Sequence, residues 1–141
     1  MAWCQWQLGE TAFAIGDYGL AENHYRAALR TAPDYFLALR SLGRVRAARG
    51  DAAAAITYYE RAVRIVPALS FLAALGDLYQ MSGQSCEANA HYELAEQMGE
   101  HSRKVHGSFF DRNLALFYAD HDMKAEAAYK LAQKEYAAGR P

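Results

Sequence analysis

The 141-residue sequence has only two cysteines and three prolines, no long apolar run and almost no net charge. Cys4 and Cys86 lack partners at metal or redox spacing, so we expect both to be buried or half-buried small apolar residues. A formal charge of −1 at pH 7 creates no field that attracts nucleic acid or an anionic membrane. The longest apolar stretches, such as residues 52–56, fall far short of the ~20 residues of a membrane span.

The N-terminal residues also lack the basic and apolar regions of a signal peptide. We therefore expect a soluble, cytoplasmic chain that binds neither nucleic acid nor a membrane. Catalytic signatures are missing too, since the sequence has no nucleophile elbow, phosphate-binding glycine loop or dinucleotide fingerprint. His101 and His106 do not share a helix face, and His121-Asp122 is predicted to form a turn. These absences predict a protein that is not an enzyme and uses no cofactor or metal.

A repeat is the main feature that the sequence does contain. Four leucines, each followed by a small residue, recur at intervals of 34, 33 and 39 residues: Leu8-Gly9, Leu42-Gly43, Leu75-Gly76 and Leu114-Ala115. An alanine follows each leucine after thirteen residues, and a large apolar residue follows after seventeen: Ala21 and Tyr25, Ala55 and Tyr59, Ala88 and Tyr92, Ala127 and Leu131. Self-similarity at this period is the signature of a helical repeat array.

These motifs resemble the tetratricopeptide repeat, in which Leu-Gly, alanine, aromatic residues and proline recur at set offsets. The resemblance implies an all-α, right-handed α-solenoid of about four helix-turn-helix repeats, with about eight helices. We place the repeats at about residues 2–33, 34–67, 68–108 and 109–138 of a single domain spanning 1–141. This domain is either complete or a fragment of a longer array.

Departures from the pattern give local predictions. Glycine inside a helix is costly, so each Leu-Gly pair predicts close approach of the partner helix. Gly50-Asp51 predicts a turn and helix cap, and Ser70 is a predicted N-cap. We expect the stem of Arg46 to lie along the core with its charged head in water. The second helix of the third repeat should run on to about Val105 and break at residues 106–108.

The fourth repeat is the least regular, and no helix with a polar outer face follows it to seal the stack. Either the array continues or another copy covers its end. In the family that the sequence resembles, the first helices line a concave groove that binds a protein or peptide. Reading the exposed positions of those helices gives these candidate partner-binding residues: Trp6, Glu10, Phe13, Arg40, Arg44, Asp77, Gln80, Phe109, Arg112 and Asn113.

Two interpretations of Arg40 and Arg44 stay open at this point. They either receive a carboxylate of the partner or pair with Glu10 and Asp77 on neighbouring helices. The predicted function is a noncatalytic protein-interaction scaffold. The alternatives are a structural segment that self-associates through its repeat ends, or a regulatory domain of a larger protein.

Overall fold

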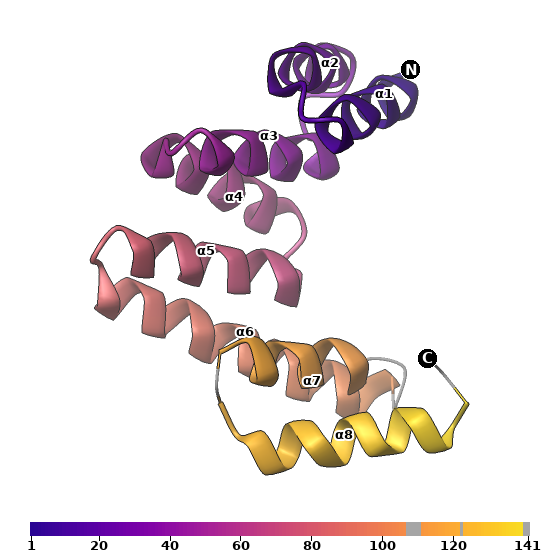
Figure 1. Ribbon diagram of the computed structural model, residues 1–141, viewed down its shortest axis with the longest axis vertical. Coiled ribbons are helices and arrows are strands. Elements are labelled where there is room, and N and C mark those ends of the chain that lie inside the picture. Colours follow the sequence, from indigo (N-terminus) through magenta and orange to yellow (C-terminus); the bar gives the residue numbers. More distant parts are fainter. Residues whose placement is uncertain (107–110, 122, 140–141) are drawn as a thin grey trace.

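The computed structural model describes residues 1–106, 111–121 and 123–139, which form an elongated stack of paired α-helices (Figure 1). The described part holds eight helices and no strand: α1 (Ala2–Ala14), α2 (Tyr18–Thr31), α3 (Phe36–Ala48), α4 (Ala52–Ile65), α5 (Leu69–Met81), α6 (Ser85–His106), α7 (Asp111–Asp120) and α8 (Ala125–Ala137). Each odd-numbered helix pairs with the helix that follows it, and the pairs stack in chain order. This arrangement confirms the predicted α-solenoid.

The turns of the first two repeats form where glycine precedes aspartate. Gly50 takes the left-handed conformation at φ +79°, and Asp51 accepts a hydrogen bond from the Ala54 amide at 3.1 Å. The predicted turn and cap are confirmed, because glycine tolerates this conformation and aspartate satisfies an unpaired amide. The prediction for Ser70 is wrong, since α5 begins at Leu69 with Ala68 as its N-cap.

Helix α6 is longer than its counterparts, as the sequence predicts. It spans 22 residues, whereas α2 and α4 have 14 each. Gly107, Ser108 and the candidate residue Phe109 lie outside the described residues.

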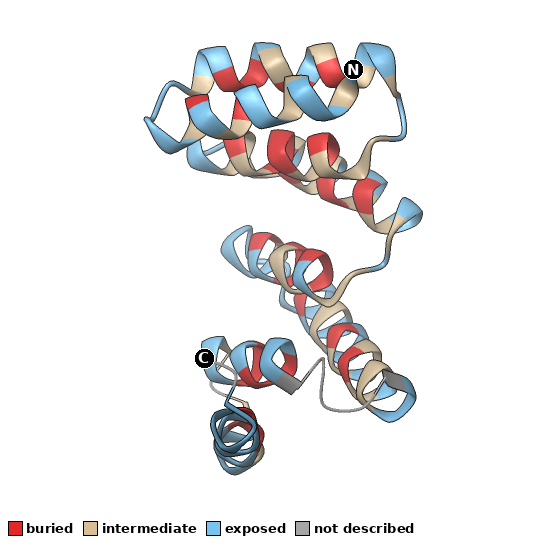
Figure 2. Cartoon of the chain, turned by 90° about the vertical axis from the view of Figure 1, so that its right-hand side faces the viewer, coloured by how far each residue is buried: buried red, intermediate tan, exposed pale blue. Residues whose placement is uncertain are grey.

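Core contacts tie each repeat to the one before it, and buried residues lie between neighbouring helices (Figure 2). Leu42 packs in one cluster with Tyr25 and Ala28 of α2. Leu75 and Leu114 pack in the same way against α4 and α6, and all three leucines are at most 1% exposed. Leu8, which we expected on a packing face, is 51% exposed because no described helix covers that side of α1.

Glycine allows the two helices of a repeat to approach closely. A Cβ atom added at Gly9, Gly43 or Gly76 would lie 2.4, 2.6 or 2.3 Å from the ring of the tyrosine in the following helix: Tyr25, Tyr59 and Tyr92, respectively. No real side chain tolerates such distances, so the predicted reason for these glycines is confirmed. The fourth repeat has Ala115 and Leu131 at the matching positions, and both are buried.

Glu22, on α2, is a buried carboxylate that the sequence analysis did not identify. It is 6% exposed and accepts hydrogen bonds from Arg46 and, at 2.8 Å, from Arg49, both in the α3 region. The head of Arg46 thus pairs with a carboxylate, which the sequence analysis did not predict, and its side chain is 24% exposed; a buried carboxylate requires such a cation. Cys4 and Cys86 are also exposed, contrary to expectation.

Candidate binding groove

Two adjoining hollows run along the first helices. The first has a volume of about 300 Å³ and is lined from α1, α3, α4 and α5 by Phe13, Arg44, Ala47, Tyr59, Ala74, Asp77 and Leu78. The second, of about 290 Å³, lies between α5 and the α7 region and shares Ala74 and Asp77 with the first. We call the two hollows together the groove. Of the candidate residues from the sequence analysis, four line it: Phe13, Arg44, Asp77 and Asn113.

Tyrosines of the second helices connect the core of a repeat with its groove side. The hydroxyl of Tyr25 donates to Glu10 at 2.7 Å, and that of Tyr92 donates to Asp77 at 2.8 Å. Both acceptors stand two residues after the repeat leucine. Burial and the bonded carboxylate raise the pKa of each tyrosine, so both hydroxyls remain protonated donors.

Glu10 lies at the centre of a network between α1 and α3. It accepts hydrogen bonds from Tyr25, from Ser41 at 2.7 Å and from Arg44 at 3.0 Å. Trp6 donates to the Ser41 hydroxyl at 3.1 Å and lines neither hollow of the groove. Burial alone would raise the pKa of Glu10, but the hydrogen bonds and the charge of Arg44 together lower it.

The two arginines of α3 differ in their surroundings. Arg44 pairs with Glu10, and its guanidinium lies 4.2 Å from the centre of the Phe13 ring. The predicted pairing is thus right for Arg44. Arg40 forms no ion pair with Asp77 or any other carboxylate in the described part of the chain, and its Nε atom is buried without a hydrogen-bond partner there.

Tyr59 is 7% exposed, yet its side chain lines the groove. The position that holds a carboxylate in the first and third repeats is Arg44 in the second. The Tyr59 hydroxyl therefore has no carboxylate acceptor among the described residues. Burial raises the pKa of Tyr59, the positive charges of Arg40 and Arg44 lower it, and Asp77 raises it, so three charged groups act on this hydroxyl.

Asp77 of α5 lines both hollows of the groove, and its side chain is 53% exposed. The Nε2 atom of His121 lies 2.8 Å from its Oδ1 atom. His121 is in a turn as predicted, but its contact with Asp77 was not expected. Its ring also lies 4.6 Å from that of Tyr92 and 4.7 Å from that of Phe117, measured between ring centres.

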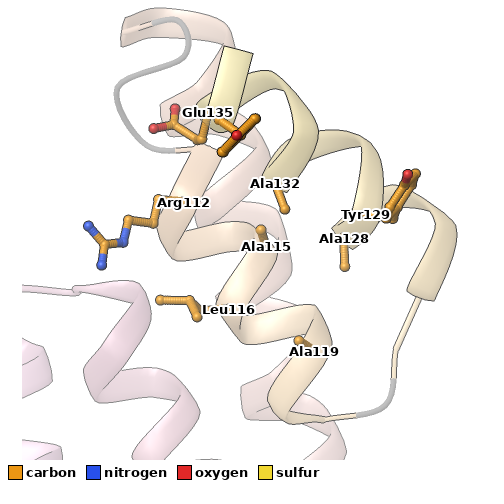
Figure 3. A pocket seen from close by; sticks show the side chains of 9 residues that line it. Arg112, Ala115, Leu116, Ala119, Ala128, Tyr129, Ala132 and Glu135 are labelled. Carbon is orange, nitrogen blue, oxygen red and sulfur yellow. The ribbon is translucent and has the colours of Figure 1, made fainter. Parts of the chain in front are cut away.

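The remaining candidate residues are dispersed. Asn113 lines the second hollow of the groove, whereas the exposed Gln80 lines neither hollow. Arg112 lines a separate hollow between α7 and α8 (Figure 3). Sequence reasoning missed Tyr59 and His121, which reach the groove from a second helix and a turn. The Gly43–Tyr59 spacing is the signal that could have identified Tyr59, because its ring crosses the first helix where that helix has no side chain.

Within the described ranges, no three histidine, cysteine, aspartate or glutamate side chains are grouped so as to hold a metal ion. None of the described helices is long and apolar enough to cross a membrane.

The stacked helix pairs and their shared groove define a helical-repeat protein of the class that serves as a scaffold for protein interactions. Residues 7–70 match the family model described as the tetratricopeptide repeat. This match covers the first two helix pairs, so that part of the chain carries tetratricopeptide repeats. A comparison with curated protein sequences gives no match.

Solved structures of the same fold include MamA, with a TM-score of 0.67, 19% identity, and coverage of 96% of this chain and 81% of that chain. The Yersinia enterocolitica type III secretion translocator chaperone SycD is similar in two structures. One, an alternative dimer, has a TM-score of 0.67 and 18% identity, covering 86% of this chain and 95% of that chain. The other has a TM-score of 0.64 and 18% identity, covering 84% of each chain.

Proposed function

We propose that this chain is a noncatalytic scaffold that binds a protein segment in the groove, with a carboxylate of that segment held by Arg40 and Tyr59. The observation that carries the proposal is the Tyr59 hydroxyl, which lines the groove, lies in the electrostatic field of Arg40 and Arg44, and has no carboxylate acceptor in the described chain. Tyr25 and Tyr92 obtain such an acceptor from their own repeats. In the second repeat, the ligand would supply it.

The charges in the second repeat favour an anionic group at this place. Arg44 forms an ion pair with Glu10, but Arg40 has no carboxylate partner in the described residues. An arginine paired with a carboxylate makes stronger hydrogen bonds than a neutral pair does.

The apolar walls of the groove define what should accompany the carboxylate. Phe13, Ala47, Ala74 and Leu78 line the first hollow beside Tyr59. Its volume of about 300 Å³ is at the lower end of small-ligand sites, which suits one or two side chains of an extended segment. We therefore expect an acidic residue next to an apolar one. The shared fold with a translocator chaperone supports a role in holding a protein segment.

The experiment selects ligands from a display library of random linear peptides on the immobilised chain, and measures their affinities by fluorescence anisotropy. Arg40 lines neither hollow itself, but its charge acts on Tyr59, and Arg40→Glu reverses that charge. The matched control is Arg61→Glu, which makes the same change at an exposed position of α4. Selected peptides should contain aspartate or glutamate. Arg40→Glu should weaken them by about tenfold or more, and Arg61→Glu by less than about twofold.

Tyr59→Phe removes only the hydroxyl and keeps the ring over Gly43. Because one hydrogen bond to a charged group contributes about 1.5–3 kcal/mol, this variant should weaken an acidic peptide by at least about tenfold. An unchanged affinity in both Arg40→Glu and Tyr59→Phe, with circular dichroism showing folded protein, would refute the proposed site. Selection of peptides without carboxylates would do the same.

A further inference from the structure

The separate hollow between α7 and α8 is mainly apolar, and it shares no lining residue with the first hollow of the groove. It has a volume of about 480 Å³, and Figure 3 shows the small side chains of Ala115, Ala119, Ala128 and Ala132 along it. Larger apolar side chains border it, and Tyr129 and Tyr136 are 64% and 86% exposed. Exposed apolar surface of this kind marks an interaction site when it is contiguous.

The chain itself shows what covers this surface elsewhere. The pair α1–α2 is covered by α3, the pair α3–α4 by α5, and the pair α5–α6 by α7. At each junction a repeat leucine enters the core of the preceding pair and becomes at most 1% exposed: Leu42, Leu75 and Leu114. The hollow on α7–α8 is the same surface of the fourth pair, so the occupant that fits it is a helix carrying such a leucine.

Helix α1 presents the complementary face. Leu8 occupies the repeat-leucine position and is 51% exposed, while Ile15 and Met1 are 75% and 86% exposed. Cys4 is exposed where the equivalent residue of α3, Ala38, is fully buried. Between these residues stand Gln7 and Thr11, so the stripe carries no charged side chain.

The charge on α1 does not oppose this contact. Its one acidic residue, Glu10, is bonded to Tyr25, Ser41 and Arg44 within the molecule. Both halves of a repeat junction are therefore present on one chain, and no described helix covers either of them. They occupy the same positions that form the three internal junctions.

We propose that the occupant of the α7–α8 hollow is a second copy of this chain, whose α1 docks there through Leu8 as α3 docks on α1–α2. The contact joins two different surfaces, so it does not close on itself. Copies add head to tail in one direction and extend the stack. The α7–α8 hollow shares no lining residue with the first hollow of the groove, so this assembly leaves the proposed carboxylate site uncovered.

The test measures weight-average mass by sedimentation equilibrium over about a hundredfold range of protein concentration. The wild-type mass should rise with concentration and pass that of a dimer. Leu8→Arg, on the α1 face, and Ala132→Arg, in the hollow, should each give a monomer. The matched control is Leu20→Arg, which places the same charge at an exposed leucine of α2 and should assemble like the wild type.

Mixing the two monomeric variants gives the decisive measurement. The Leu8→Arg protein keeps an intact hollow, and the Ala132→Arg protein keeps an intact α1. Together they should form a dimer with one copy of each and should grow no further. A wild-type protein that is monomeric throughout, a Leu8→Arg protein that still associates, or a mixture that stays monomeric would each overturn the proposal.

Discussion

The contact between Gly43 and Tyr59 gives a prediction in which two known effects oppose each other. Alanine in a helix interior is about 1 kcal/mol more favourable than glycine. A Cβ atom at residue 43, however, would lie 2.6 and 2.7 Å from two ring atoms of Tyr59. Because carbon atoms pack at about 3.5–4.0 Å, the ring must move by about 1 Å within a core that includes Phe71 and Leu75.

Such overpacking costs about 1–3 kcal/mol, which exceeds the gain in helix propensity. We therefore expect Gly43→Ala to lower the free energy of unfolding by up to about 2 kcal/mol. Gly19→Ala is the matched control, because the nearest atoms to its added Cβ lie at 3.7 and 3.8 Å. That substitution should be neutral or should stabilise the protein by up to about 1 kcal/mol.

The assay is urea denaturation followed by circular dichroism, in the wild type and in a Tyr59→Leu background. Once the ring is absent, Gly43→Ala should become stabilising, giving a coupling energy of about 1–3 kcal/mol. The fourth repeat already carries this combination, with Ala115 opposite Leu131. If Gly43→Ala stabilises both backgrounds equally, a clash with the Tyr59 ring is not the reason for glycine at position 43.

Three further substitutions test the stacking and the ion pairs. Leu42→Ala should cost about 2–5 kcal/mol in urea denaturation, whereas Leu8→Ala should cost less than about 1 kcal/mol, and equal losses would contradict the assigned junctions. Glu10→Gln should lower stability at neutral pH. The folded-state pKa of Glu10 lies below 4.5, so this difference should persist above pH 4.5 and disappear as the pH falls below it. Glu22→Gln should cost about 2–3 kcal/mol in thermal or urea denaturation because Arg46 loses its counter-charge, and a loss under about 0.5 kcal/mol would show that the pair contributes little.

The repeat positions could be predicted from sequence because each contact recurs within one period. Glycine and tyrosine sixteen residues apart meet in three repeats, and the same arrangement repeats by stacking. The sequence could not predict the exposure of Leu8 and Cys4. Whether a repeat's outer face is buried depends on whether another helix packs against it. The residues of the repeat itself do not show this.

The candidate groove could be predicted only in part, for a related reason. Phe13, Arg44 and Asp77 line it because helical spacing places them on one face of their helices. Tyr59 and His121 enter it from a second helix and from a turn, which helical spacing alone does not reveal. Arg46 and Glu22 occupy non-equivalent positions of two successive repeats, so the repeat period does not predict their pairing.

The assignment of roles to repeats depends on one pair of positions, the second and the seventeenth after each repeat leucine. These pairs are Glu10 and Tyr25, Arg44 and Tyr59, Asp77 and Tyr92, and Leu116 and Leu131. In the first and third repeats the carboxylate accepts the tyrosine hydroxyl, so the pair is satisfied within the chain. In the second repeat Arg44 replaces the acceptor, and the Tyr59 hydroxyl lines the groove without a carboxylate acceptor among the described residues. In the fourth repeat both residues are apolar, and the surface there matches a helix instead of a carboxylate. Under the two proposals above, the same scaffold acquires an anion-binding site and a stacking surface through substitutions at two positions that do not alter its fold.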